Sequence, residues 1–96
     1  MLFVICAWDG IDGKTKRKAY YPSHTAYLTG AATQYGVKVL LAGPLVEDDA
    51  ETPLGSLFVV DAPDRTTVES FHAADPFSVH EVWTKRSITA FLKRRG

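Results

Sequence analysis

The chain has 96 residues, of which 46% are hydrophobic and 23% are charged, a composition typical of one soluble globular domain spanning residues 1–96. Eleven basic residues balance eleven acidic ones, which argues against nucleic acid or an anionic membrane as the main partner. The apolar N-terminal run is too short for a membrane span or a signal peptide, so a cytoplasmic location is expected. Cys6 is the single cysteine, so it has no partner for an internal disulfide, and its apolar neighbours indicate a core position.

The first third of the chain predicts a strand followed by a helix. Residues 2–8 form an unbroken apolar run, which is typical of a central strand buried on both faces. Residues 14–18 are a charged approach to the helix, which is expected to begin at Pro22, because proline suits the first helical turn. Gly36 is expected to end it. The apolar face of this helix comprises Tyr20, His24, Tyr27, Leu28, Ala31 and Tyr35.

Two further strands follow and form a hairpin. Residues 37–42 are the first of them, and Gly43 with Pro44 interrupts it, which fits an edge strand or a bulge. An acidic loop at residues 47–53 leads to the next strand at residues 54–61.

The last third predicts a helix and a final strand. Asp64 is a suitable N-cap for the helix, and Asp75 followed by Pro76 ends it, because the residue before a proline avoids the helical region. The last strand spans residues 81–93. It is long, so a bulge or bend is expected near residues 86–87.

The order strand, helix, strand, strand, helix, strand predicts a fold of the α+β class. It is the ferredoxin-like βαββαβ arrangement, in which a four-stranded antiparallel sheet carries both helices on one face. Alternation along the strands directs half of the apolar side chains, including some of Val4, Val39, Leu57 and Val59, away from the helices. An apolar sheet face indicates an interface, so we expect a homodimer in which two sheets pack face to face.

His24 and Asp75 are the two polar residues whose positions suggest chemistry. The helices run antiparallel in the predicted fold, so the start of the first and the end of the second lie at the same end of the molecule. Packed helices are about 8–10 Å apart, a distance that an imidazole and a carboxylate can bridge. The pair would form an acid–base dyad near neutral pH. A purely structural role is the alternative, because an aspartate before a proline often bonds local backbone N–H groups.

Several short motifs occur together with this pair. Behind a basic approach to the first helix they are, in order, His24, Ala42-Gly43-Pro44, Gly55-Ser56-Leu57 and Asp75-Pro76-Phe77. Over residues 2–91 the chain thereby resembles the YCII-related (YciI-like) domain family. The resemblance implies a dimeric α+β barrel and a pocket that holds His24 and Asp75 with Ser56 nearby. One branch of the family removes chloride from chlorinated hydroxyhydroquinones without a cofactor, whereas most members have no assigned reaction.

The chain departs from the family pattern at two places. Many members carry an arginine three residues before the histidine, whereas Tyr21 stands there in this chain and Arg17 lies one further turn back. A pocket that usually offers a guanidinium to an anionic substrate would then offer a phenol. Residues 79–82 read Val-His-Glu-Val, where the family often has Gly-Val. The resemblance therefore leaves the substrate class open.

The expected roles follow from the residue types. His24 is the candidate general base, and Asp75 would orient its ring and stabilise the imidazolium. Ser56 would donate a hydrogen bond to a substrate oxygen, or it is a plain strand serine. No G-x-S-x-G elbow surrounds it, so a nucleophilic triad is not expected. The positions expected to bind substrate are Tyr21, Tyr27, Gly43, Pro44 and Phe77.

Three functions are compatible with these residues. The first is a lyase, isomerase or dehydrochlorinase-type enzyme acting on a small cyclic or aromatic acid or phenol, with no cofactor, because the sequence contains neither a dinucleotide-binding loop nor a P-loop. The second is a non-catalytic module for small-molecule binding or assembly. The third is metal binding by His24, His72 and His80 with Asp75, although their spacing matches no strong motif. Haem binding would need an apolar pocket of haem size beside His24.

Overall fold

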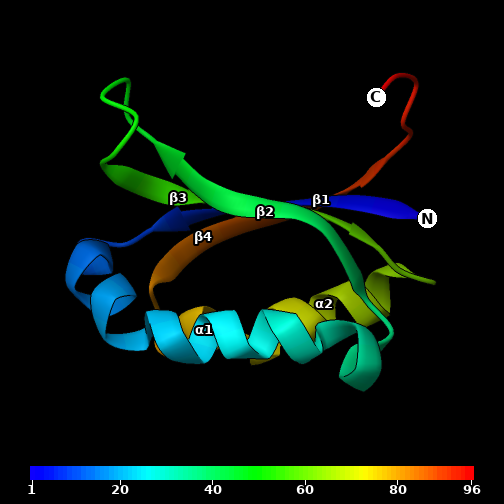
Figure 1. Ribbon diagram of the computed structural model, residues 1–96, viewed down its shortest axis with the longest axis horizontal. Coiled ribbons are helices and arrows are strands. Elements are labelled where there is room, and N and C mark those ends of the chain that lie inside the picture. The colour runs from blue at the N-terminus through cyan, green and yellow to red at the C-terminus, as the bar shows by residue number, and fades with distance from the viewer.

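The computed structural model of the chain is built on a four-stranded antiparallel sheet whose helices all lie on one face among the residues described (Figure 1). The structure describes the backbone of residues 1–96 and all side chains except those of residues 31 and 32. The expected place of Ala31 on the apolar helix face therefore lies outside the described residues. The elements are β1 (Leu2–Asp9), α1 (Gly13–Tyr35), β2 (Lys38–Val46), β3 (Pro53–Asp61), α2 (Arg65–Ala74), α3 (Pro76–Val79) and β4 (Trp83–Phe91).

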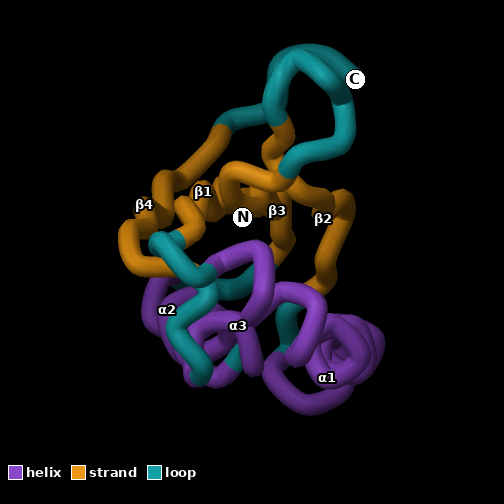
Figure 2. Tube along the Cα trace, turned by 90° about the vertical axis from the view of Figure 1, so that its left-hand side faces the viewer, coloured by secondary structure: helices purple, strands orange, loops and turns teal.

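The sheet has the strand order β2-β3-β1-β4, and every neighbouring pair is antiparallel. This topology confirms the predicted ferredoxin-like α+β fold. Figure 2 shows the strands stacked over the helices, with the opposite face of the sheet bare of helix. Among the described residues, no helix combines the length and apolar character needed to cross a membrane.

Alternation along β1 decides which side chains enter the core. Phe3, Ile5 and Ala7 are buried beneath the helices, whereas Val4 and Cys6 on the other face are only half-buried. The expectation that β1 is buried on both faces, with Cys6 in the core, is therefore wrong for this chain alone. The core between sheet and helices includes Phe58, Val60, Val68, Phe71, Phe77, Val82 and Trp83.

Helix α1 begins at Gly13, nine residues before the expected start, and Pro22 lies inside it. The charged segment at residues 14–18 is therefore helical. A proline has no backbone N–H, so in a helix the carbonyl oxygen four residues earlier loses its hydrogen-bond donor. In Figure 1 the blue first turns of α1 stand at an angle to the cyan run that follows, a bend for which a proline is the usual cause.

The corner between α2 and α3 is organised by Asp75. Asp64 caps α2 as predicted, its carboxylate accepting from the backbone N–H of Thr67, and α2 ends before Asp75 as predicted. The chain then forms the short helix α3, with Pro76 at its first position and the carboxylate of Asp75 as its N-cap. The Asp75 side chain accepts from the backbone N–H of Phe77 at 2.9 Å.

Two strand predictions need correction. Strand β2 continues through Gly43 and Pro44 instead of breaking there, because it is an edge strand and tolerates a residue without an N–H. Strand β4 is shorter than expected, and its pairing with β1 shifts register between Trp8 and Asp9. Residues 86–87, where a bulge was expected, pair regularly.

Candidate functional site

The structure brings His24 and Asp75 into direct contact, although 51 positions separate them in the chain. His24 Nδ1 lies 2.7 Å from Asp75 Oδ1 and 2.9 Å from Oδ2, and the residues are only 8% and 1% exposed. An ionised carboxylate can only accept hydrogen bonds, so the proton of a neutral His24 lies on Nδ1. Nε2 then carries a free lone pair, which is the state that a general base requires.

Aromatic side chains hold the imidazole in this orientation. The ring of Phe77 stacks on His24 with 4.0 Å between ring centroids and an interplanar angle of 2°. Trp83 and Phe58 meet the imidazole edge-on, at centroid distances of 5.9 Å and 6.2 Å. Because Phe77 directly follows the Asp75-Pro76 corner, the same turn supplies both the carboxylate and the stacking ring.

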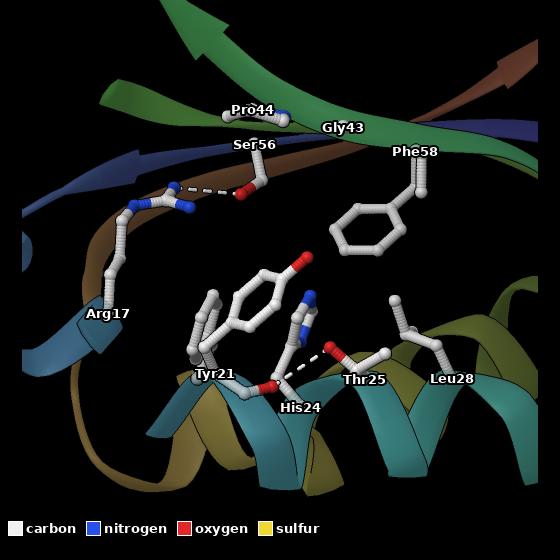
Figure 3. A pocket seen from close by; sticks show the side chains of 11 residues that line it. Arg17, Tyr21, His24, Thr25, Leu28, Gly43, Pro44, Ser56 and Phe58 are labelled. Carbon is white, nitrogen blue, oxygen red and sulfur yellow. Dashed lines mark hydrogen bonds between the residues drawn. The ribbon is translucent and has the colours of Figure 1, made fainter. Parts of the chain in front are cut away.

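A cavity of about 270 Å³ opens in front of His24, between α1 and strands β2 and β3 (Figure 3). Figure 3 shows the His24 ring rising from α1 toward the sheet, with Tyr21 beside it and Ser56 on the opposite wall. Of the residues predicted to form a site, the cavity is lined by His24, Tyr21, Gly43, Pro44, Ser56 and Phe77. Thr25, Leu28, Ala42 and Phe58 also line it and were not foreseen.

Tyr27 does not line this cavity. Its hydroxyl donates to the carbonyl oxygen of Phe71 at 2.7 Å, and its ring packs between Phe71 and Tyr35. Burial, together with the neighbouring Tyr35, raises the pKa of the Tyr27 hydroxyl above its usual range. Tyr27 therefore joins α1 to α2, and its expected contact with substrate has no support from its position.

Arg17 is the main site residue that the sequence interpretation missed. Its Nε and Nη2 donate to the two carboxylate oxygens of Asp9 at 2.6 Å and 2.8 Å, and Nη2 also donates to Ser56 Oγ at 2.8 Å. The expectation that a phenol replaces the guanidinium is thus wrong, because Arg17 and Tyr21 both line the cavity. The signal was the spacing of Arg17 and His24, which puts them two turns apart on one face once α1 extends to Gly13.

The three histidines do not converge on one point. His72 is buried and stacks on Trp83 at 4.9 Å, whereas His80 is exposed and stacks on Tyr20 at 3.8 Å. Burial and the nearby positive charge of Arg86 lower the pKa of His72 to about 4. Within the described part of the chain, no three His, Cys, Asp or Glu side chains are placed to hold a metal ion. The metal alternative accordingly has no structural support.

Fold and cavity together define a small ferredoxin-like α+β domain with a buried His–Asp pair beside a pocket. The chain belongs to the YCII-related domain family, whose model matches residues 1–92. No significant match was found among curated proteins.

Solved structures provide a more specific comparison. The chain is similar to the 5-chloro-2-hydroxyhydroquinone dehydrochlorinase (TftG) of Burkholderia phenoliruptrix AC1100, solved with 2,5-dihydroxybenzoquinone, with a TM-score of 0.82 and 25% identity over 96% of this chain and 94% of that chain. An antibiotic biosynthesis monooxygenase is similar with a TM-score of 0.54 and 17% identity, covering 99% and 100% of the two chains. A NIPSNAP domain protein from Burkholderia xenovorans has a TM-score of 0.51 and 15% identity, covering 100% and 99%. The last two similarities concern the fold alone.

Proposed function

We propose that this protein is a cofactor-independent acid–base enzyme that acts on a small hydroxylated ring, with dehydrochlorination or isomerisation as its reaction type. The observation that carries the proposal is the 2.7 Å contact between His24 Nδ1 and Asp75 Oδ1, which leaves Nε2 as the basic nitrogen of the ring. The similarity to a dehydrochlorinase over 96% of the chain supports the reaction type.

The shape of the cavity suits a flat substrate. Phe77, Phe58 and Pro44 supply apolar walls, and Tyr21 adds an aromatic ring at the exposed side. Arg17 and Ser56 form the polar wall, suited to an oxygen that becomes negative during proton transfer. A hydroxylated six-membered ring would therefore find apolar surface for its carbon atoms and polar partners for its oxygens.

Loss of hydrogen chloride from a chlorinated hydroxyhydroquinone requires proton transfers and no external oxidant. His24 Nε2 would accept the proton of a ring hydroxyl and return it to the carbon that bears chlorine, which converts the enol into a ketone. Chloride then leaves with the electron pair of the carbon–chlorine bond. A second hydroxyl loses its proton to His24, and its O–H electron pair completes a quinone. The net loss is one proton and one chloride, while Asp75 stabilises the imidazolium at each transfer.

The test is chloride release from 5-chloro-2-hydroxyhydroquinone, the compound named for the similar dehydrochlorinase. We expect turnover by the native chain and a fall of at least about a hundredfold in His24→Gln. His80→Gln is the matched control, because His80 stacks on Tyr20 outside the cavity, and it should retain full turnover. Equal rates for native protein and His24→Gln would refute the proposal. Binding of 2,5-dihydroxybenzoquinone with no turnover of the chlorinated compound would favour the non-catalytic alternative.

We also propose that residues 1–96 form one domain that assembles as a homodimer through the face of the sheet opposite the helices. The support is apolar surface on that face, where Trp8 is 43% exposed and Leu41 is 55% exposed. Light scattering at micromolar concentration should give the mass of two chains, and Trp8→Lys should shift the mass toward that of one. A native protein that is entirely monomeric under these conditions would contradict the proposal.

A further inference from the structure

Two oppositely charged segments border the face of the sheet that carries no helix. The acidic loop, residues 47–53, contains four carboxylates, and residues 93–95, here called the basic segment, read Lys-Arg-Arg. Residues 47–51 and 93–95 are all exposed. None of the salt bridges among the described residues involves either segment. Each segment therefore presents charge that a single copy of the chain does not neutralise.

The acidic loop is held in shape by its own hydrogen bonds. The carboxylate of Asp49 accepts from the backbone N–H groups of Glu51 and Thr52, each at 2.9 Å. The backbone N–H of Glu47 donates to the carbonyl oxygen of Thr52 at 3.0 Å, which closes the loop. Asp49 is thus engaged inside the loop, whereas the carboxylates of Glu47, Asp48 and Glu51 face solvent and remain for a partner. Three carboxylates match the three cations of the basic segment.

Both segments project from the same side of the sheet but at opposite ends of it. In Figure 1 the green loop between β2 and β3 rises at the upper left, and the red segment after β4 rises at the upper right. Figure 2, the view turned by 90°, again shows both above the sheet, where their projections overlap. The two segments are therefore separated along the long axis of the molecule and lie at a similar depth across it.

The direction of a two-fold axis decides which segments would meet in a pair of copies. An axis parallel to the viewing direction of Figure 1 and placed above the sheet turns a second sheet to face the first and exchanges left and right. The acidic loop of each copy then lies over the basic segment of the other. An axis along the long dimension of the sheet would put loop on loop and basic segment on basic segment, an arrangement that like charges oppose.

Apolar surface lies between the two charged segments. Trp8, Leu41 and Phe91 are exposed, and Phe91 pairs in register with Leu2 on the face that points away from the helices. Leu92, which directly precedes the basic segment, is 70% exposed. Apolar contacts of this kind supply affinity, whereas opposite charges at the rim of an interface set its orientation. The charged segments are thus placed to select one of the arrangements that the apolar face alone would allow.

We propose that two copies of the chain pack sheet to sheet with crossed charges, so that the acidic loop of each copy binds the basic segment of the other. The two-fold symmetry makes each contact between loop and basic segment occur twice. The inference rests on the homodimer proposed above, and it adds the orientation of the two copies and the contact that selects this orientation.

The test reverses the charge of one segment at a time and measures the dimer dissociation constant by sedimentation equilibrium at low ionic strength. One variant is Arg94→Glu with Arg95→Glu, and the other is Asp48→Lys with Glu51→Lys. An exposed ion pair contributes about 1.4- to 5-fold in affinity, and each variant replaces two attractions by repulsions in both contacts. We therefore expect each to raise the dissociation constant at least about tenfold.

Lys14→Glu with Lys18→Glu is the matched control. It changes the net charge by the same amount as the reversal of the basic segment, at two exposed positions of α1 on the helix side of the sheet. The dissociation constant should stay within about threefold of native.

A mixture of the two reversed variants supplies the decisive comparison. Each variant alone repels a second copy of itself, because its loop and its basic segment then carry the same sign. In an equal mixture every loop can again face a segment of opposite charge, so a heterodimer should form with near-native affinity, and native mass spectrometry identifies it by its mass.

Native dissociation constants in both reversed variants, or a mixture that forms no heterodimer, would overturn the crossed arrangement. These outcomes are separable from the homodimer itself. Reversed variants that dimerise as the native chain does refute the crossed charges and leave the homodimer standing, whereas a native chain that is entirely monomeric refutes both.

Discussion

Replacement of Asp75 by asparagine tests the postulated dyad with little change in shape. The carboxylate accepts hydrogen bonds from His24 Nδ1 and from the backbone N–H of Phe77. A carboxamide has only one oxygen, and the N–H of Phe77 can only donate. Oδ1 accepts from Phe77 and also lies 2.7 Å from Nδ1, whereas Oδ2 lies 2.9 Å from Nδ1. If the amide oxygen takes the Oδ1 position, the new NH₂ group replaces Oδ2 beside Nδ1, where a donor favours the tautomer that carries its proton on Nε2. The nitrogen that faces the cavity would then be a donor and no longer a base.

The size of the effect follows from these contacts. A hydrogen bond to a charged group contributes about 1.5–3 kcal/mol, and loss of that support for the imidazolium alone slows the reaction about 10- to 150-fold. The wrong tautomer adds to this, and an equivalent exchange in a serine-protease triad lowers kcat about 10⁴-fold. We therefore expect kcat to fall by about 10² to 10⁴ in Asp75→Asn. Because the cap on Phe77 is retained, stability should change by only about 1 kcal/mol.

Chloride release measures the rate, and ¹⁵N chemical shifts of the histidine ring report the tautomer directly. Asp64→Asn is a matched control, since Asp64 also caps a helix but is exposed and remote from the cavity, and asparagine is as good an N-cap as aspartate. It should keep the native rate. A folded Asp75→Asn protein with kcat within about threefold of native would show that the carboxylate does not orient a base.

Two further predictions concern stability. The pKa of His72 is about 4, against 6.5 for an unperturbed histidine, so the unfolded chain binds a proton more readily between these values. The contribution of neutral His72 to the free energy of unfolding is complete above pH 6.5, and about 3 kcal/mol of it is lost as the pH falls to 4. In His72→Phe the free energy of unfolding, measured by urea at each pH, should depend less on pH between 6.5 and 4. An unaltered dependence would show that His72 is not the group responsible. Gly55→Ala would place a Cβ in steric clash with the Ala7 carbonyl oxygen and should destabilise by about 1–3 kcal/mol. Gly30→Ala adds a Cβ that meets no described atom within 4 Å outside the neighbouring residues and backbone of its own helix, and should stabilise by about 0.5–1 kcal/mol. Equal effects of the two glycine changes would refute the packing argument.

The elements that were predicted correctly depend on local signals. Alternating and continuous apolar runs identified the strands, and the Asp75-Pro76 pair marked the end of α2. Given antiparallel helices on one face of the sheet, the contact between His24 and Asp75 follows from where each residue lies along its helix. Topology and one dipeptide were therefore enough to anticipate the pair, although its role in catalysis stays a prediction.

The features that were missed depend on contacts between distant segments. Pro22 suggested a helix start, but α1 extends through it and is supported before it by the partly buried Arg17–Asp9 pair. Nothing near Arg17 in the sequence indicates that it will bind Asp9 at the end of β1. Likewise, the bond from Trp83 to Ser56 joins residues 27 positions apart on strands that are not neighbours. No periodicity along either strand reveals such a contact.

The proline within α1 has a mechanical consequence for ligand capture. Pro22 lies between Arg17 and His24 in α1, and because it has no N–H the helix lacks one backbone hydrogen bond there. The turn that carries Arg17 and the turn that carries His24 can therefore change their relative angle without breaking a further backbone hydrogen bond. A change in the angle between these two turns would alter the width of the cavity, because Arg17 and His24 both line it.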